Sequence, residues 1–384
     1  MARVFVLLLS LLQVISFANA AATVHPPAHG PGATCKNPAV RKEWRSLTKT
    51  EQKNWINAVK CLAKKPHRPS LAPTVPIAES LIPPINPNSS AYDDWAYVHM
   101  GHYEPDLNIK IRFTGLFFPW HRWLLSAFET DLKENCGFQG TQPYWDWSLD
   151  ASNVAKSPLF TNFDKETGLG GWGDPANDYA VHTGAFSNTS GFKFAYPSPH
   201  TLRRNLTMQP FLGNTVFLTD PAQPALYVNE TFTPAQVHKM VNGFVGDYKG
   251  LQTYIEGFNG THQGVHLMLG GDLGGNCPAN AVVPAQCQNN NPTYATNEPI
   301  FWMHHAMVDK IWADWQANNK HNGKSYFGGS VESLKNVSYF NEFPTGAPPN
   351  YLVNDTMPAD GLFPDPTISS MLSTTEGPLC YVYE

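Results

Sequence analysis

The sequence predicts a mainly helical fold with long irregular connections and little sheet. The strongest helix is expected over residues 116–134, where apolar side chains recur at helical spacing on one broad face. A second helix is expected to open at Thr48, because Thr48 and Glu51 form a capping-box pattern ahead of an apolar stripe. Residues 148–235 are rich in Gly, Asn, Pro and Thr, which predicts long surface connections with short helices.

Further helices are expected in both halves of the chain. One should begin at Pro38, because proline suits the first helical position. Helical patterns also occur at residues 92–101, from Thr233, at 253–271 and at 297–316. Because core-forming helices come from both halves, residues 21–384 are expected to form one domain; a boundary within 150–235 is the alternative.

Composition excludes some classes of protein. Of the 384 residues, 15% are charged and 12% are aromatic, including 11 Trp, which is typical of a globular chain and not of a disordered one. The formal charge of −5 provides no basic patch for nucleic acid. No apolar run is long enough to span a membrane comfortably, so no membrane partner is expected.

The N-terminus predicts secretion. Arg3, an apolar run over 4–17 and the small-residue exit Ala18-Asn19-Ala20 are typical of a signal peptide over residues 1–20. A short membrane anchor is the alternative.

Sequons and cysteines agree with an extracellular destination. N-glycans are expected at some of seven Asn-x-Ser/Thr sequons, which begin at Asn88, Asn188, Asn205, Asn229, Asn259, Asn336 and Asn354. Six cysteines predict up to three disulfides, with Cys277 and Cys287 as the expected local pair.

Histidines form the clearest chemical pattern. "THQGVH" places His262 and His266 four residues apart, so that on a helix both imidazoles face the same way and can share a metal. "FWMHHAMVDKIWADW" places His304 and His305 in an apolar helix, where a hydrogen-bonded core histidine is the alternative to a ligand. Further histidines, His99, His102 and His121, lie in "YDDWAYVHMGH" and "PWHRW". A set of imidazoles without thiolate or a clear carboxylate favours copper over a 2-His-1-carboxylate iron site.

Several blocks resemble one known family. In order, they are "YDDWAYVH", "FFPWHRW", "QPYWDW", "THQGVHLMLGGD" and "NEPIFWMHHAMVDKIW". They are similar to the tyrosinase and catechol oxidase family of type-3 copper proteins, in particular its short secreted fungal forms. The resemblance implies a helical core with a four-helix-bundle type copper site, two copper ions, and phenolic substrates that react with dioxygen.

The resemblance also implies metal ligands. It assigns His262, His266 and His305 to one copper, and His99 and His121 to the other. The remaining ligand is expected nine residues before His121, where this chain has Arg112, and a guanidinium is not a metal ligand.

Three interpretations of Arg112 remain open. His102 completes the site, or the second copper position is weak or absent while the first is intact, or the protein binds no copper. Arg112 could also bind an acidic group of the substrate, because guanidinium pairs with carboxylate in a bidentate manner.

Three other residues are expected to act in catalysis by the same resemblance. Gln263, directly after the first ligand of its block, and Glu256 would hold a water that deprotonates a phenol. Phe301, one turn before His305, would stack near the copper ions as a gate. Arg122 and Asp309 are expected to form an ion pair beside the site.

Together, the signal-peptide pattern and the resemblance imply a secreted copper-dependent phenol oxidase that converts o-diphenols to o-quinones. Monophenols are further candidate substrates, which the protein would hydroxylate as a monooxygenase. A phenolic or tyrosyl secondary metabolite is another candidate. The alternatives are a relative with an altered or single-copper site, acting in a specialised metabolite pathway or as a non-catalytic glycoprotein, and a reversible oxygen carrier.

Overall fold

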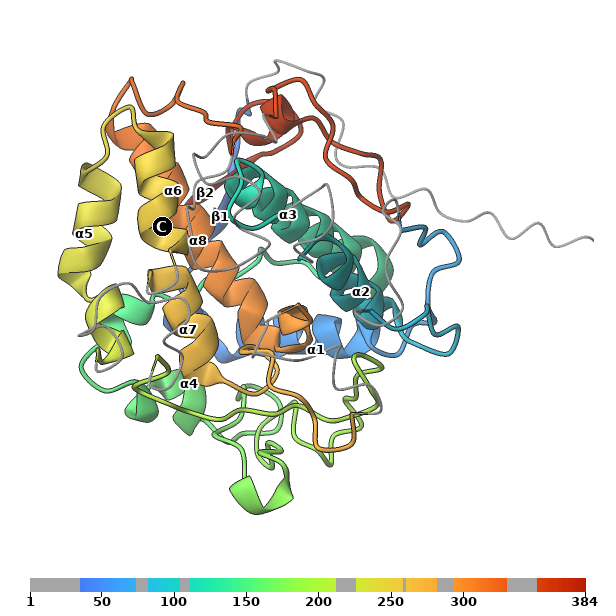
Figure 1. Ribbon diagram of the computed structural model, residues 1–384. Coiled ribbons are helices and arrows are strands. Elements are labelled where there is room, and N and C mark those ends of the chain that lie inside the picture. Colours follow the sequence, from blue (N-terminus) through green and yellow to red (C-terminus); the bar gives the residue numbers. More distant parts are fainter. Residues whose placement is uncertain are drawn as a thin grey trace, which may run out of the picture.

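Helices form the interior of the molecule, as the sequence predicts. The computed structural model describes residues 35–73, 82–103, 111–211, 226–257, 260–281, 293–329 and 351–384. Two long helices, α3 (Phe117–Cys136) and α8 (Pro299–Asn318), pack against each other in its centre. Helix α2 (Ala91–Tyr103) lies beside α3, and α7 (Thr261–Leu269) lies beside α8 (Figure 1). The predicted helical core is confirmed.

The remaining helices and strands surround this core. Helix α1 (Lys49–Leu62) packs on α3, and α5 (Pro234–Asn242) packs on α8. Helix α6 (Tyr248–Glu256) precedes α7, and α4 (Pro158–Thr161) is a single turn. Short 3₁₀ turns are found at Trp44–Ser46, Trp147–Asp150, Val154–Lys156, Pro175–Asn177, Val228–Phe232, Ala295–Asn297 and Ile368–Met371.

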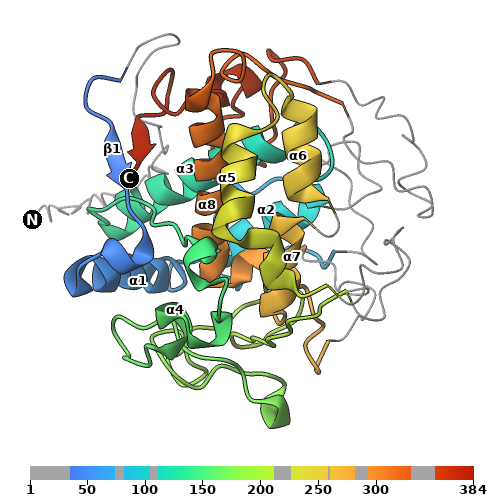
Figure 2. The same ribbon diagram turned by 90° about the vertical axis from the view of Figure 1, so that its left-hand side faces the viewer.

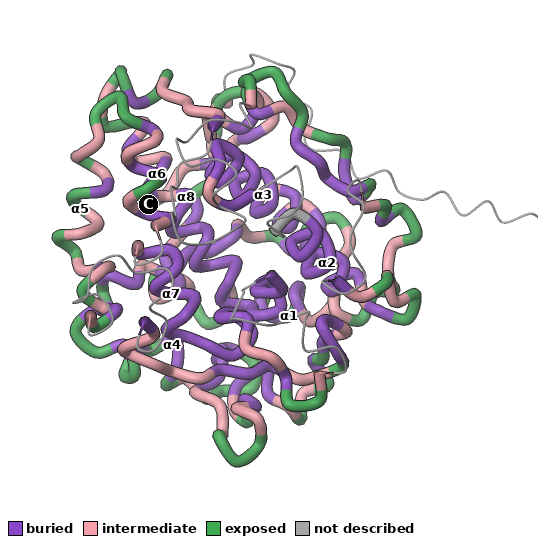
Figure 3. Tube along the Cα trace, in the orientation of Figure 1, coloured by how far each residue is buried: buried purple, intermediate pink, exposed green. Residues whose placement is uncertain are grey.

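Aromatic side chains fill the space between the central helices. The rings of Phe128 on α3 and Trp302 on α8 stack with centroids 3.6 Å apart, and Phe118 stacks on Trp312 at 5.1 Å. All four side chains are buried. The described parts of α3, α7 and α8 are buried along most of their lengths, whereas α5 is exposed on its outer side (Figure 3).

The capping-box prediction is confirmed at atomic detail. The Thr48 hydroxyl accepts from the Glu51 backbone N–H, and the Glu51 carboxylate accepts from the Thr48 backbone N–H. Thr48 is therefore the N-cap of α1, which begins at Lys49.

The predicted helix at Pro38 is wrong. Residues Ala39–Arg41 form strand β1, which pairs in parallel with β2 (Tyr381–Tyr383) at the other end of the chain (Figure 2). An extended backbone satisfies its peptide groups through this partner, and it carries Arg41 inward to the Glu129 carboxylate on α3. The disulfide Cys35–Cys380 joins the same two segments.

The C-terminal strand also supports the central helix α8. The hydroxyls of Tyr381 and Tyr383 both donate to Asp309 Oδ2 at 2.6 Å. Arg122 on α3 donates to Asp309 Oδ1 at 2.5 Å, which confirms the predicted ion pair. Although burial alone disfavours the carboxylate, Arg122 and Arg41 hold the pKa of Asp309 below its ordinary value.

Two further findings bear on the prediction of up to three disulfides. Cys61 on α1 is bonded to Cys136 at the end of α3, a pair that the sequence could not select. Cys277 is disulfide-bonded as well, and its expected partner Cys287 lies outside the described residues.

Buried ion pairs hold the long connection between α4 and α5 against the core. His200 Nε2 lies 2.7 Å from Asp272 Oδ1, and the other carboxylate oxygen of Asp272 accepts from the Arg203 backbone N–H. Gly271 has a positive φ of 49°, and a Cβ there would lie 2.0 Å from the Arg203 carbonyl oxygen. A larger residue would therefore separate this connection from the end of α7.

In the part of the chain that the structure describes, no helix has the length and apolar character needed to cross a membrane.

Replacing Tyr383 with Phe should destabilise the protein by about 1.5–3 kcal/mol, because a hydrogen bond to a buried carboxylate is lost. Chemical denaturation measures the change. Tyr227→Phe is the matched control: Tyr227 is exposed, and its substitution should change stability by less than about 0.5 kcal/mol. Equal stability of the two variants would contradict the role of the tail.

The His200–Asp272 pair predicts a pH-dependent stability. Burial disfavours the charged imidazole, but Asp272 outweighs this and raises the pKa of His200 above its ordinary value. The stabilisation is therefore complete below the unfolded-state pKa of about 6.5 and is lost as pH rises through the folded-state pKa. The difference in unfolding free energy between the wild type and His200→Gln should shrink as pH rises from 5 to 9. A constant difference would contradict this assignment.

Candidate metal centre

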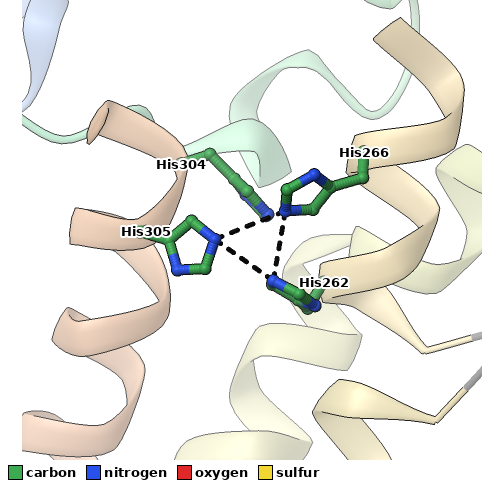
Figure 4. Close-up of side chains that lie close together, drawn as sticks. All are labelled: His262, His266, His304 and His305. Carbon is green, nitrogen blue, oxygen red and sulfur yellow. Dashed lines mark hydrogen bonds between the residues drawn. The ribbon is translucent and has the colours of Figure 1, made fainter. Parts of the chain in front are cut away.

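Three imidazole nitrogens converge on one point in the core. The Nε2 atoms of His262, His266 and His305 lie 3.1, 3.2 and 3.3 Å from one another (Figure 4). Three nitrogens bound to one metal at about 2.0 Å would be separated by roughly 3.3–3.5 Å. The three side chains are each about 1% exposed. Their arrangement fits a metal ion held by three imidazoles.

Two helices position these nitrogens. His262 and His266 lie one turn apart on α7, as their spacing predicts, and His305 projects from α8 toward them (Figure 4). His266 Nδ1 lies 2.8 Å from the Leu273 carbonyl oxygen, so Nδ1 carries the proton and the lone pair is at Nε2. Gly264 lies between the two histidines, and a Cβ there would come within 2.8 Å of Val228.

His304 joins this cluster in space but is oriented differently. Its nitrogen lies within 4.8 Å of those of the other three. Trp147 Nε1–H donates to His304 Nδ1 at 3.1 Å, so in the neutral ring the proton is at Nε2. A protonated nitrogen offers no lone pair to a metal. The contacts therefore give His304 a supporting position beside the three-imidazole set.

Two more histidines face the cluster from α2 and α3. The His121 ring stacks on the His305 ring with centroids 4.3 Å apart, and the His99 ring is 5.9 Å from that of His121. Nδ1 of His121 is 2.7 Å from the Phe117 carbonyl oxygen, and Nδ1 of His99 is 2.5 Å from that of Thr293. Each contact places the lone pair at Nε2, and Nε2 of His121 is buried without a hydrogen-bond partner.

His102 lies within α2, but its side chain is outside the described part of the structure. The alternative in which it completes the second set of ligands therefore stays a prediction.

Burial keeps the rings of His262, His266, His305 and His121 neutral, the form that binds metal. Burial is the main cause that lowers the pKa of His262, His266, His305 and His121 well below the ordinary value. Burial likewise lowers the pKa of His304 to about 3. Because only neutral imidazole binds a metal, these shifts favour metal binding at neutral pH.

Arg112 lies beside the cluster in a network of its own. Its Nε donates to Glu256 Oε1 at 2.8 Å, and its Nη2 donates to Gln263 Oε1 at 3.0 Å. Glu256 also accepts from the Phe113 backbone N–H at 2.7 Å and from Gln252 Nε2 at 2.8 Å. Arg112 is 5% exposed and Glu256 is fully buried. The charge of this guanidinium is therefore already paired within the protein.

This pairing unites three residues that sequence reasoning treated separately. Glu256 and Gln263 were expected to hold a water, and Arg112 was considered a lost ligand position or a clamp for substrate. Burial raises the pKa of Glu256, although Arg112 partly opposes the shift. Nε and Nη2 of Arg112 both donate to protein oxygens. Two of the five N–H donors of the guanidinium are therefore not available to bind an acidic group of a substrate.

Phe301 lies between the two sets of histidines. Its ring centroid is 4.2 Å from that of His305, 5.2 Å from His99 and 6.1 Å from His266. One turn earlier, Glu298 caps α8 and binds the buried Arg204 through both carboxylate oxygens at 2.7 and 2.8 Å. The start of α8, which carries Phe301 and His305, is fixed in this way.

Comparisons with known proteins identify the family. Residues 89–318 match the family model for the common central domain of tyrosinase. The matched residues make up more than half of the chain. The chain belongs to the tyrosinase family. This membership makes it a tyrosinase-family copper oxidase, and the blocks that suggested the family all fall within or beside the matched residues.

Relatives in fungi and one solved structure agree with this assignment. The chain is 29% identical over 381 residues to tyrosinase ustQ of Aspergillus flavus, covering 97% of this chain and 88% of that protein. It is 27% identical to N-acetyl-6-hydroxytryptophan oxidase ivoB of Emericella nidulans, covering 91% and 93%. A polyphenol oxidase from Thermothelomyces thermophila superposes with a TM-score of 0.62 at 26% identity, covering 90% and 89%.

Sequence reasoning missed several supporting groups. Trp147 orients His304, Gln252 supports Glu256, and backbone carbonyls of Thr293 and Leu273 orient two ligand candidates. "QPYWDW" carried a signal for Trp147, because a tryptophan N–H in a buried position needs an acceptor. The backbone carbonyls could not be predicted as partners, because every residue has one whatever its side chain.

Replacing Glu256 with Gln should destabilise the protein by about 3–5 kcal/mol, because it leaves the Arg112 guanidinium buried without a counter-charge. Replacing both residues with Met should cost much less than the sum of the two single changes. Urea denaturation of the single and double variants measures both. Additive effects would show that the two groups do not interact.

Proposed function

We propose that this protein is a secreted copper-dependent oxidase that converts o-diphenols to o-quinones with dioxygen. The observation that carries the proposal is the convergence of His262, His266 and His305 opposite His99 and His121. Copper, when bound there, would supply the dioxygen and electron-transfer chemistry. The donor set suits copper because all candidate ligands are imidazoles.

The chain's own residues would hold the metal and exclude water. The ligand rings are buried, and the carbonyl contacts of His99, His121 and His266 fix which nitrogen faces inward. Phe301 covers the rings of His99 and His305 on one side. A phenol that reaches this centre would therefore meet an apolar wall, in keeping with the aromatic class of substrate.

Diphenols are the better candidates than monophenols. Hydroxylation of a monophenol requires removal of its proton, and Glu256 with Gln263 would be the groups to assist it. In this chain both side chains accept hydrogen bonds from Arg112. These contacts occupy acceptor oxygens that would otherwise hold the water, even though burial keeps the pKa of Glu256 above its ordinary value. The proposed activity is accordingly diphenol oxidation.

The relatives suggest where such an oxidase acts. The name of the Emericella nidulans protein specifies a hydroxylated aromatic amino-acid derivative as its substrate. This chain covers 93% of that protein at 27% identity, which supports our proposal that the substrate here is a phenolic specialised metabolite.

Secretion and glycosylation are part of the same proposal. Residues 1–20 would be removed as a signal peptide, leaving 21–384 as the copper domain. Asn88 and Asn354 are exposed and suited to N-glycans, whereas the side-chain nitrogen of Asn229 donates to the Ala151 carbonyl oxygen. Asn188 and Asn205 are half-buried, and Asn259 and Asn336 lie outside the described residues.

An altered-centre relative is the second candidate function. The observation that favours it is Arg112, because a guanidinium occupies the sequence position of a ligand. Such a protein would bind copper at the three-imidazole set but would fail to oxidise diphenols even when copper is in excess.

The His266→Gln variant tests the proposed function. It should lose at least about 100-fold in catechol oxidation and should bind less copper, because one of three imidazoles is removed. Quinone formation is followed by absorbance, and copper by elemental analysis of the purified protein.

His238→Gln is the matched control, since His238 lies exposed on α5 and should tolerate the same change with full activity. Equal activity of the two variants would refute the proposed centre. A copper-replete wild type that does not oxidise catechol would favour the altered-centre alternative.

A further inference from the structure

We propose that three tryptophans, Trp120, Trp123 and Trp95, form a relay that supplies electrons to the metal centre when no phenol is present to do so. The relay rests on the proposed function for its oxidant, which is the copper centre after reaction with dioxygen or peroxide. Its role is protection, because an electron drawn from an indole spares the buried ligands from oxidation.

The relay begins at Trp120, which lies against the histidines of α2 and α3. The Trp120 ring centroid is 5.1 Å from that of His121 and 6.1 Å from that of His99. A single ring-to-ring contact therefore separates this indole from each candidate ligand on this side of the centre. The Trp120 Nε1–H donates to the Pro358 carbonyl oxygen at 3.3 Å, which leaves the indole without a charged partner at its nitrogen.

Two further indoles continue the path. Trp123 follows Trp120 on α3 with ring centroids 5.4 Å apart, and Trp95 on α2 lies 6.5 Å from Trp123. Tryptophan is among the most easily oxidised side chains, so an electron passes along such a series in short steps, each faster than one long step. Trp120 and Trp95 are fully buried, whereas Trp123 is 5% exposed and gives the path an edge at solvent.

Charged groups favour Trp95 as the end of the path. The Trp95 Nε1–H donates to Asp131 Oδ2 at 2.8 Å, and a carboxylate stabilises positive charge on the indole. Arg68 opposes this, because its guanidinium carbon is 5.3 Å from the Trp95 ring centroid. However, Arg68 is paired with two carboxylates, Asp94 and Asp131, so with His67 neutral the negative charge exceeds the positive. Positive charge is thus drawn from the centre toward Trp95.

A second contact reaches Trp95 from α8. Trp302 lies 6.1 Å from Trp95, but the Phe301 ring stands between Trp302 and His305, at 5.3 and 4.2 Å from them. Phenylalanine is much harder to oxidise than tryptophan. The series through Trp120 is therefore the better path from the histidines to Trp95, since each of its rings is oxidisable.

One electron moves in each step. The oxidised centre takes an electron from Trp120, which becomes an indole radical cation. Trp123 then reduces Trp120, and Trp95 reduces Trp123. No proton leaves, because the Trp120 N–H faces a carbonyl oxygen, which is not a base, and the Trp95 N–H stays in its hydrogen bond to a carboxylate already paired with Arg68. A small diphenol or enediol in solvent returns the electron at Trp123 and releases its own hydroxyl proton to water.

Treating copper-loaded protein with hydrogen peroxide in the absence of phenol tests the relay, with peptide mass mapping of oxidised tryptophan as the readout. In the wild type, Trp120, Trp123 and Trp95 should be oxidised before Trp172, a half-buried residue that stacks on Phe160 instead. Trp123→Phe should remove the oxidation of Trp95 and increase that of Trp120, because the path is cut between them. Trp172→Phe is the matched control and should leave the pattern unchanged.

A second variant cuts the path at its end. Trp95→Phe should increase the oxidation of Trp120 and Trp123, and it replaces Trp123→Phe if that chain does not fold. Thermal unfolding and copper analysis of every variant verify that folded and equally loaded proteins are compared.

Three results would overturn the relay. They are oxidation of Trp172 at the rate of Trp95, which indicates radicals that diffuse through solvent, oxidation of Trp95 that persists in Trp123→Phe, and no oxidised tryptophan at all. A wild type that oxidises catechol but leaves Trp95 intact refutes the relay and keeps the proposed activity. The predicted pattern of oxidised tryptophans in a protein that does not oxidise catechol does the reverse.

Discussion

The site depends on keeping three neutral imidazoles turned toward one point inside an apolar core. Burial supplies neutrality, because it penalises the charged form of each ring. Orientation comes from helix geometry and from partners on the far side of the rings, such as the Leu273 carbonyl behind His266. The aromatic stacking between α3 and α8 keeps the opposing helices at the distance that brings His121 onto His305.

Charged groups around the core serve this arrangement. Asp309, one turn after His305, binds Arg122 on α3 and two tyrosines of the C-terminal strand. Glu298, at the start of the same helix, binds Arg204 from the long connection. The helix that carries His305 is thus fixed on both sides of this residue by segments far away in sequence. The polar network around Arg112 does the same for α6 and α7.

Local signals in the sequence were sufficient for the central helices and for the His262/His266 pair. A capping box depends on residues three apart, and the spacing of His262 and His266 depends on one helical turn. The helix expected at Pro38 was wrong because its strand partner lies more than 340 residues away. The sequence showed that Arg112 departs from the family's ligand pattern, but it could not show which residues bind Arg112. Its partners Glu256 and Gln263 lie 144 and 151 residues away in the sequence.

The number and kind of ligands around the first copper test the proposed three-imidazole site most directly. X-ray absorption at the copper edge, on protein loaded with one equivalent, measures both. Three imidazole nitrogens at about 2.0 Å are expected, with the outer-shell scattering that imidazole rings give. A copper surrounded mainly by water or carboxylate oxygen, with no imidazole pattern, would contradict it.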